Sequence, residues 1–492
     1  MVKMSFNQRL WITMLIRHDH SRPASSVKSP LFSSSSVLSS YSLIKQKLYE
    51  DSANKLGYPV SLETSEGDLD LSELGVTKGS LANIFINNVG DPVKDSQSFQ
   101  MEVKSFEREV ILMFGNYFKI TDVCGYVTSG GTEANQAGIW WAKRRLALSD
   151  SKLRSLVDES IKSLESQLHP INTLSSSKKI ALQRQLLKEY KVREDLSFPG
   201  LFYTKDHTHY SIKKIADINH LRVIEIDSSD SGKMDLNDFE VKVKEFIESY
   251  PHAQIIVNAN IGTTITGAFD DIPGIKKILM QNIPDRHAIH IDGALTGMVL
   301  PLLKLFGERA DYLNSIGGDS IAVSGHKFLG LPQPCGVILT TLPKLHAAFS
   351  QTSHHIEYVG NIHDITVAGS RSGFNVLMLH KALTHLELNT SSNKLQIQLN
   401  NSLSQAINLQ HQLEIFYPKH QVQLPNHFHV LFPKPSEAIA KKYQLMQNGK
   451  NAVACILNNV STKLIKSFII DLKDEIENSI EDNHYATSKY KS

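Results

Sequence analysis

The sequence predicts an α/β fold built on a mostly parallel, doubly wound β-sheet. Between residues 201 and 340, short apolar runs of β-like character alternate with helix-like stretches such as 235–250, and this alternation favours parallel strands joined by crossover helices. Small or reactive residues follow several of these runs, at the strand ends where such sheets bind ligands. The β-like runs are residues 201–204, 222–226, 254–258, 289–292, 321–324 and 337–340.

Composition limits the classes of function. The chain has 492 residues, of which 41% are hydrophobic and 21% charged, so it can bury a large core and form two or more domains. A formal net charge of +2 favours neither nucleic acid nor an anionic surface as a partner. Three widely spaced cysteines indicate a reducing compartment without a disulfide framework. We therefore expect a cytoplasmic protein, and no apolar run approaches the ~20 residues of a membrane span.

The chain divides into three expected regions. Residues 1–56 form a Ser-rich, basic tail followed by an arm helix; we interpret the tail as disordered, with organelle targeting as the alternative. Residues 57–375 form a large domain, and residues 376–492 a small C-terminal α/β domain. Residues at about 150–196 carry apolar positions at helical spacing around a His-Pro break, which predicts an inserted helical hairpin. This insertion either covers surface or contacts a partner.

A glycine-rich loop precedes a helix-like segment in residues 125–135, GYVTSGGTEAN. Backbone N–H groups at a helix start bind anions, and Ser129 and Thr132 add hydroxyl donors around Gly130 and Gly131. The loop suits a phosphate, although an ordinary N-cap turn has the same composition. It matches neither the Walker pattern nor GxGxxG, which disfavours nucleotide binding.

Asp292 ends a β-like run in the stretch HAIHIDGALTG. A carboxylate at this end of a strand faces the ligand crevice of an α/β sheet. Opposite a protonated ring nitrogen at ~4 Å, with an effective dielectric constant near 20, the attraction is roughly 4 kcal/mol, or about three pKa units. That interaction would keep a weak ring base protonated, whereas the alternative is a surface or helix-capping carboxylate.

Two histidines follow another β-like run in YTKDHTHYS. His209 can stack on an aromatic cofactor, and a structural histidine is the alternative. His207 lies two residues earlier, but the chain has no HExxH motif or cysteine cluster, so we expect no metal.

Lys327 follows a short β-like run in SIAVSGHKFLGLPQPCG, within a Gly/Pro-rich turn. A lysine at a strand end is placed to reach into a cleft, where partial desolvation lowers the amine pKa and makes it a nucleophile that forms Schiff bases. A surface lysine beside a turn is the alternative.

Taken in chain order, from the glycine loop through His209 and Asp292 to Lys327, these stretches resemble the pyridoxal-phosphate-dependent group II amino-acid decarboxylases. The likeness is greatest to bacterial histidine decarboxylases and plant-type serine decarboxylases, and it covers roughly residues 57–383. It implies the aspartate aminotransferase-like fold, called fold type I, and the cofactor pyridoxal 5'-phosphate (PLP). The matching stretches are GYVTSGGTEAN, KDHTHYS, NIGTTITGAFDDI, HIDGALTGMVLP, SGHKFLGLPQPCG and TVAGSRSG.

The resemblance also implies roles for individual residues. Lys327 would bind the cofactor aldehyde, and Asp292 would pair with its ring nitrogen. His209 would stack on one ring face, Ala294 would lie against the other, and Thr264 would lie near the ring oxygen. The cofactor phosphate would be held by Ser129, Gly130, Gly131, Thr132, Ser324 and His326.

The catalytic set implied by the resemblance comprises Lys327, His209, Asp292 and Tyr358, the last as a mobile-loop acid that protonates the product carbon. Two departures from the family pattern stand out. His207 precedes the single histidine of the HYS motif, and the family's SRNG followed by His becomes Arg371-Ser372-Gly373-Phe374, in a segment that lies near the subunit interface and the substrate mouth in this family.

The expected activity is decarboxylation of an L-amino acid to its amine and CO2, with L-histidine giving histamine as the first choice. The alternatives are L-serine to ethanolamine, another fold-type-I reaction such as transamination or a lyase reaction, and a non-catalytic scaffold. The expected partners are the amino-acid substrate and a second copy of the chain in a homodimer whose active site lies near the subunit interface. No nucleic acid is expected.

Overall fold

The computed structural model describes residues 41–48, 81, 86–93, 95, 101–169, 174–303, 312–350, 364–388 and 393–489. The chain divides into two units, Met1–Phe85 and Ile86–Ser492. In the first unit, residues 41–48 form a helix, inside the range predicted for the arm. The expected disordered tail lies outside the described residues.

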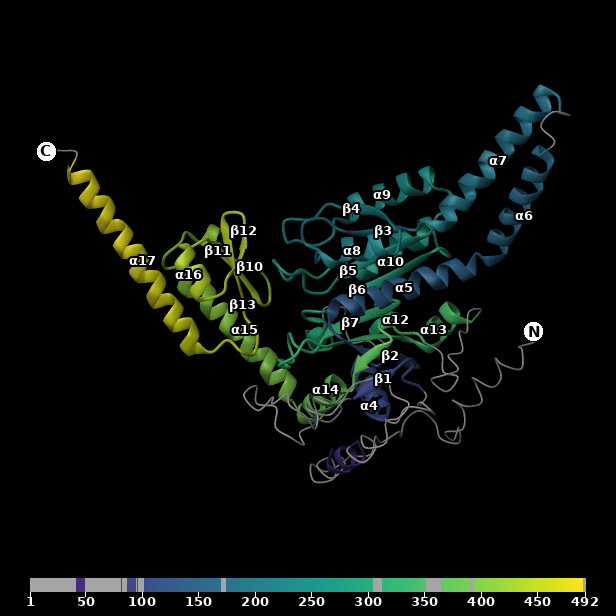
Figure 1. Cartoon of the computed structure of the whole chain (residues 1–492). Helices are drawn as coiled ribbons and strands as arrows, with labels where there is room; N and C mark the ends of the chain where they lie inside the picture. Colours follow the sequence, from purple (N-terminus) through teal and green to yellow (C-terminus); the bar gives the residue numbers. More distant parts are fainter. Residues whose placement is uncertain are drawn as a thin grey trace, which may run out of the picture. The chain divides into compact units, whose positions relative to one another are not determined.

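A seven-stranded sheet forms the centre of the second unit, in the strand order β2-β8-β7-β6-β5-β3-β4 (Figure 1). β8 runs opposite to every other strand of this sheet, because it pairs antiparallel with both β2 and β7. The pairings that join β4, β3, β5, β6 and β7 are all parallel. The predicted α/β class is therefore confirmed. The strands are β2 (Val123–Thr128), β3 (Gly200–Thr204), β4 (Arg222–Ile226), β5 (Ile255–Asn260), β6 (His287–Asp292), β7 (Ser320–Ser324) and β8 (Gly336–Thr341).

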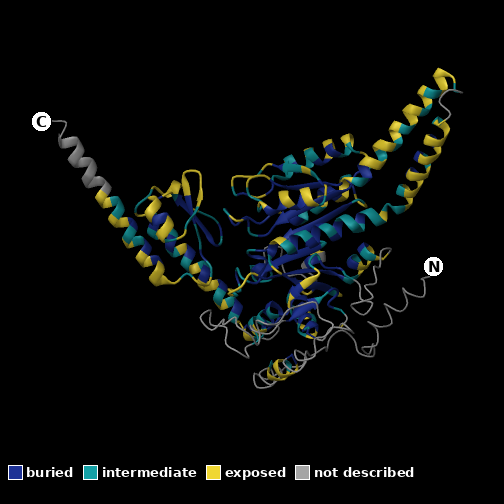
Figure 2. Ribbon diagram, viewed as in Figure 1, coloured by how far each residue is buried: buried dark blue, intermediate teal, exposed yellow. Residues whose placement is uncertain are grey.

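Most strands of this sheet are buried along their whole length, as Figure 2 shows. Such strands need apolar residues on both faces, which explains the continuous apolar run at the start of β5. Helices cover them. In α9 (Leu236–Ser249), Phe239 and Phe246 pack edge-on against Phe202 of β3, with ring centroids 5.9 and 5.4 Å apart. The other helices of this region are α5 (Gly131–Ser149), α8 (Ser211–Ile218), α10 (Ile272–Asn282), α11 (Leu300–Leu303), α12 (Tyr312–Ile316) and α13 (Leu342–Phe349).

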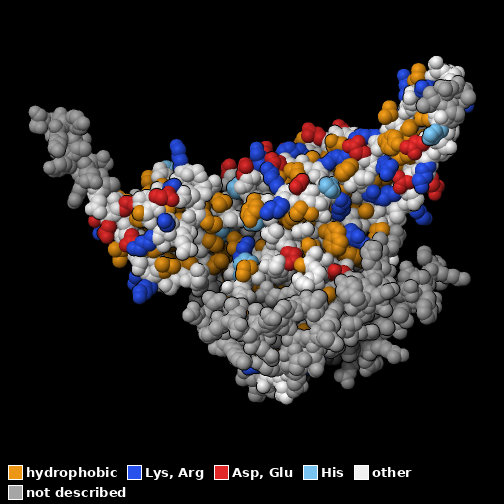
Figure 3. Space-filling view, viewed as in Figure 1, with side chains coloured by type: hydrophobic (Ala, Val, Ile, Leu, Met, Phe, Trp, Pro, Cys, Tyr) orange, Lys and Arg blue, Asp and Glu red, His pale blue; other side chains and the backbone are white. Residues whose placement is uncertain are grey.

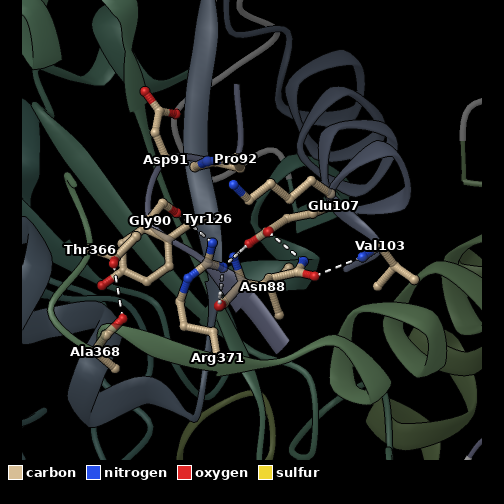
Figure 4. A network of polar contacts seen from close by, with 12 residues as sticks. Asn88, Gly90, Asp91, Pro92, Val103, Glu107, Tyr126, Thr366, Ala368 and Arg371 are labelled. Carbon is tan, nitrogen blue, oxygen red and sulfur yellow. Dashed lines mark hydrogen bonds and ion pairs between the residues drawn. The ribbon is translucent and has the colours of Figure 1, made fainter. Parts of the chain in front are cut away.

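A two-stranded antiparallel sheet joins β1 (Asn87–Val89) to β9 (Ser370–Ser372). Beside it, α4 (Lys104–Phe118) carries Glu107, whose carboxylate accepts hydrogen bonds from the Asn88 side chain, from the Val127 backbone N–H and from Arg371 (Figure 4). Arg371 also donates to the Gly90 carbonyl at 2.8 Å and lies over the Tyr126 ring. Arg371, which this segment shares with the family's SRNG pattern, thus lies in a buried network.

The expected helical insertion corresponds to α6 (Ser151–Leu168) and α7 (Ser176–Ser197), which pack against each other (Figure 1). Val157, Ile161 and Leu164 of α6 are buried, whereas most of α7 is exposed (Figure 2). Ser175 caps α7 by accepting a hydrogen bond from the Lys178 N–H. We propose that this hairpin is an insertion into the large domain, as its sequence indicated.

The C-terminal part contains a four-stranded antiparallel sheet in the order β10-β11-β13-β12. An apolar cluster that includes Leu409, Phe432 and Phe468 packs the helices onto this sheet. We propose that residues 376–492 form a small domain on this cluster. The elements are α14 (Gly373–His385), α15 (Lys394–Leu413), β10 (Gln423–Asn426), β11 (His429–Pro433), α16 (Glu437–Lys442), β12 (Met446–Asn448), β13 (Asn451–Cys455) and α17 (Thr462–Lys489).

Candidate active site

A cavity of about 300 Å³ lies where β2, β3, β5, β6 and β7 end and their following loops begin. Parallel strands bring their carboxyl ends to one edge of the sheet, so residues far apart in sequence meet there. Tyr358 lies outside the described residues. The expected site residues that line the cavity are Ser129, Gly130, Gly131, Thr132, His209, Thr264, Asp292, Ala294, Ser324, His326 and Lys327.

One side of the cavity has the features of an anion site. Helix α5 begins at Gly131 with no side-chain cap hydrogen bond, so backbone N–H groups of its first turn face the cavity region. The Ser324 hydroxyl is buried and has no hydrogen-bond partner among the residues that the structure describes. A Cβ atom at Gly131 would lie 2.8 Å from Ser324 Oγ and 2.9 Å from Ala294 Cβ, so only glycine allows this close approach. Uncapped N–H groups and an unpaired hydroxyl together suit a phosphate group.

The turn after β7 places His326 and Lys327 on the cavity wall. The Gly325 N–H donates to the Cys335 carbonyl at 2.9 Å, which closes the base of this turn. From the C-terminal part, the Asn458 side chain donates to the Phe328 carbonyl at 3.1 Å. The lysine is therefore carried by a segment that is hydrogen-bonded at both ends.

Asp292, at the end of β6, is buried at one side of the cavity. Its Oδ2 accepts a hydrogen bond from Asn135 Nδ2 at 2.8 Å, and its Oδ1 accepts one from the Ala294 N–H at 3.1 Å. Both carboxylate oxygens are thus held in place, which orients the charge.

Of the two candidate histidines, His209 lines the cavity. Its Nδ1 lies 2.7 Å from Ser211 Oγ, and its ring is tilted against Tyr210 at 4.4 Å. Burial lowers the pKa of His209; the Asp292 charge opposes this shift and Lys327 adds to it. The imidazole is therefore neutral at pH 7, which favours face-to-face contact with a ring.

The loop after β5 carries Thr264. Its ends are joined by hydrogen bonds from Gly262 N–H to the Ala268 carbonyl and from Gly267 N–H to the Thr263 carbonyl, both 2.9 Å. Asn426, in the C-terminal part, donates to the Thr266 carbonyl at 2.9 Å. The C-terminal part therefore supports this wall of the cavity.

Several cavity or supporting residues were not assigned a role from the sequence. Asn135, Glu133 and Asn260 line the cavity. Asp270 accepts hydrogen bonds from both the backbone and the side chain of Asn260, at 2.6 and 3.0 Å. Burial raises the pKa of Asp270 to about 6, while these bonds and one from the Met234 N–H oppose the shift. Asn135 and Asp270 both lie within the stretches that resemble the family, and this position is the sequence signal by which they could have been found.

The lining fits a phosphorylated aromatic aldehyde such as PLP. An anion cradle, an amine, a neutral imidazole and an anchored carboxylate surround one cavity. Among the described residues, no group of three or more His, Cys, Asp or Glu side chains could hold a metal ion. No helix in the described ranges is long and apolar enough to cross a membrane. On the face shown in Figure 3, acidic and basic side chains are interspersed.

Comparisons with known proteins agree with this geometry. The family described as "Pyridoxal-dependent decarboxylase conserved domain" matches residues 177–426. A histidine decarboxylase of Acinetobacter baumannii is 31% identical over 431 residues, covering 85% of this chain and 90% of the relative. Serine decarboxylase 3 of Oryza sativa subsp. japonica is 30% identical over 418 residues, covering 84% and 76% respectively.

Solved structures support the fold. L-methionine decarboxylase from Streptomyces sp. 590 superimposes with a TM-score of 0.61 at 19% identity, covering 90% of this chain and 96% of that one. Together with the family match and the relatives near 30% identity, these findings identify the cofactor as PLP and the reaction class as amino-acid decarboxylation. The chain belongs to the pyridoxal-dependent decarboxylase family.

Proposed function

We propose that the protein decarboxylates L-histidine to histamine, with the cavity at the strand ends as its active site. The main observation behind this assignment is that one cavity is lined by Lys327, Asp292 and His209, which come from three separate strand ends. Lys327 supplies the amine that binds the cofactor aldehyde, His209 stacks on the ring, and Thr264 lies near the ring oxygen. The Gly130–Thr132 loop, Ser129, Ser324 and His326 hold the phosphate, and Ala294 lies on the second ring face.

Bound PLP supplies the electron sink that accepts the pair released when the bond between the α-carbon and the carboxylate breaks. The protein supplies charge and orientation. Asp292, held through both oxygens, keeps the ring nitrogen protonated. The cavity walls would have to hold the substrate carboxylate out of the ring plane, because only then can the electrons of the breaking bond enter the π system of the ring.

The reaction is balanced by one proton transfer. CO2 leaves, and a proton takes its place on the α-carbon to give the amine. The Lys327 side chain lines the cavity and would be one donor of this proton. Tyr358, on a segment outside the described residues, is the other proposed donor.

Two features support histidine as the substrate. The Acinetobacter baumannii histidine decarboxylase is matched over 90% of its length, compared with 76% for the rice serine decarboxylase. In addition, Tyr210 lines the cavity with 72% of its surface exposed; its ring already contacts His209 and Lys214, and the exposed remainder supports contact with an imidazole. L-serine remains the second candidate, because the serine decarboxylases share the same level of identity.

The test is to incubate the PLP-loaded protein with L-histidine, L-serine and the other common amino acids, and to measure CO2 and the matching amine. Histamine formation with a kcat/KM at least about tenfold above that for serine is expected, a difference of ~1.4 kcal/mol in the barrier. Ethanolamine as the main product would transfer the assignment to serine. Amino-group exchange with an added keto acid, without CO2, would contradict decarboxylation. Lys327→Ala serves as the control and should lose the borohydride-trapped cofactor adduct.

We further propose that the protein is a cytoplasmic homodimer whose active site lies near the subunit interface. The three unpaired cysteines, Cys124, Cys335 and Cys455, support a reducing compartment, and the dimer rests on the family resemblance alone. Sedimentation of the PLP-loaded protein as a monomer would contradict the dimer.

A further inference from the structure

Asp292 lies at the end of a chain of buried side chains drawn from β6, β7 and α5. Asn135 Nδ2 lies 2.8 Å from Asp292 Oδ2, and Asn135 Oδ1 lies 3.0 Å from His290 Nε2. His290 Nδ1 lies 2.8 Å from Ser320 Oγ. All of these residues are buried, so water does not compete for their hydrogen bonds.

The charge on Asp292 fixes the direction of every hydrogen bond in this chain. A carboxylate only accepts, so Asn135 must turn its NH2 group toward Asp292 and its carbonyl toward His290. His290 Nε2 must then carry the hydrogen, which leaves Nδ1 to accept from the Ser320 hydroxyl. The opposite arrangement would place a carbonyl oxygen against the carboxylate. The hydrogen bonds therefore run in one direction, from the Ser320 hydroxyl through His290 and Asn135 to the Asp292 carboxylate.

The surroundings keep His290 neutral and close to α5. Burial lowers the pKa of His290 to about 4, and the charge of Asp292 opposes this shift. A neutral imidazole adds no positive charge that would compete for the carboxylate. A Cβ atom at Gly138 would lie 2.3 Å from His290 Nδ1 and 2.9 Å from Ser320 Oγ. Glycine at this helix position therefore allows Asn135, one turn earlier, to reach both partners.

We propose that Asn135, oriented by His290 and Ser320, is a positioning residue that holds the Asp292 carboxylate in place and aimed at the cofactor ring nitrogen. This inference rests on the proposed pairing of Asp292 with that nitrogen. Asn135 acts through Asp292, because its amide is committed to the carboxylate on one side and to His290 on the other.

The experiment compares the affinity of the cofactor-free protein for PLP and for an analogue in which a CH group replaces the ring nitrogen. Both compounds carry the aldehyde and the phosphate, so the ratio of their dissociation constants reports only the ring-nitrogen interaction. A general effect on folding changes both constants by the same factor and leaves the ratio unchanged. The wild-type protein should prefer PLP by about tenfold or more, as expected for a hydrogen bond between charged groups.

In Asn135→Leu, the buried carboxylate loses one of its two donors and is no longer held in the orientation that faces the ring nitrogen. The preference for PLP should then fall below about threefold, as it should in Asp292→Ala, where the charge is absent. His290→Gln, whose Nε2 can still donate to Asn135, should keep the preference, whereas His290→Leu should lose it.

The outcomes separate the two levels of the proposal. A wild-type protein without a preference for PLP would show that Asp292 does not pair with the ring nitrogen, and the inference would fail with it. A preference that is lost in Asp292→Ala but kept in Asn135→Leu would overturn the role of Asn135 alone. Equal weakening of both cofactors by Asn135→Leu, with the ratio unchanged, would show that the residue only packs α5 against the sheet.

Discussion

The buried pair of Glu107 and Arg371 provides a test of how the strand leading to the phosphate loop is held. The Glu107 side chain is 0% exposed and that of Arg371 is 3% exposed. Besides Arg371, Glu107 accepts from Asn88 Nδ2 and from the Val127 N–H of β2, both at 2.8 Å (Figure 4). Removing either partner leaves a buried charge without its counter-ion, which typically costs about 3–5 kcal/mol.

The perturbations are Glu107→Leu, Arg371→Leu and the double variant. Each single variant should lose about 3–5 kcal/mol, whereas the double variant buries no unpaired charge and should lose about 2–3 kcal/mol less than the sum of the two. The assay is urea unfolding followed by fluorescence, with equal slopes in the four proteins as evidence that the same transition is compared. Single-variant costs that add to within ~0.5 kcal/mol would refute the reasoning, since independent sites behave that way.

Three further predictions concern the site, the hairpin and pH. Asp292→Asn should retain the borohydride-trapped cofactor but lose turnover by roughly 1,000-fold, as the loss of ~4 kcal/mol of electrostatic stabilisation implies; near-normal turnover would contradict the electron-sink role. Replacing residues 162–187 with a short Gly-Ser turn keeps the contacts of the hairpin base and should leave turnover and dimerisation unchanged, and monomers on sedimentation would instead make the hairpin an assembly element. Burial lowers the pKa values of His290 and His429 to about 4, so the unfolded chain binds more protons between about pH 6.5 and 4 and each histidine removes up to ~3 kcal/mol of stability as the pH falls. Asp270, with its pKa raised to about 6, stabilises the folded protein as the pH falls over nearly the same range. Two histidines outweigh this one carboxyl group, so the urea midpoint should still fall on acidification, and it should fall less in His429→Leu. An unchanged dependence of the midpoint on pH in that variant would contradict the burial argument.

Much of the fold and of the cavity could be predicted because their signals are local in the sequence. A buried parallel strand requires a continuous apolar run, and the residue after that run is at the ligand edge of the sheet. Lys327, Asp292 and His209 each follow such a run, and each lines the cavity. No knowledge of which strand neighbours which is needed to place them.

The supporting residues could not be predicted in this way, because their partners are distant in sequence. Asn135 and Asp292 are separated by 157 positions, and Glu107 and Arg371 by 264. A buried asparagine or glutamate in a helix has the same composition whether it faces a carboxylate, an arginine or a backbone N–H. Only the packing of α5 on β6 and of α4 beside β9 decides the partner, and no local sequence pattern predicts either packing.

One face of α5 connects the two ends of the proposed cofactor site. Gly131, Asn135 and Gly138 are spaced by four and three residues, so they lie on the same side of the helix. The first approaches Ser324 at the anion side, the second binds Asp292, and the third contacts His290. The absence of a Cβ at two of these positions brings the helix close enough for the asparagine between them to reach the carboxylate. A side chain at either glycine would move the helix away from the sheet, and because α5 is a single rigid element, the anion side of the cavity would change and Asp292 would lose its Asn135 donor at the same time.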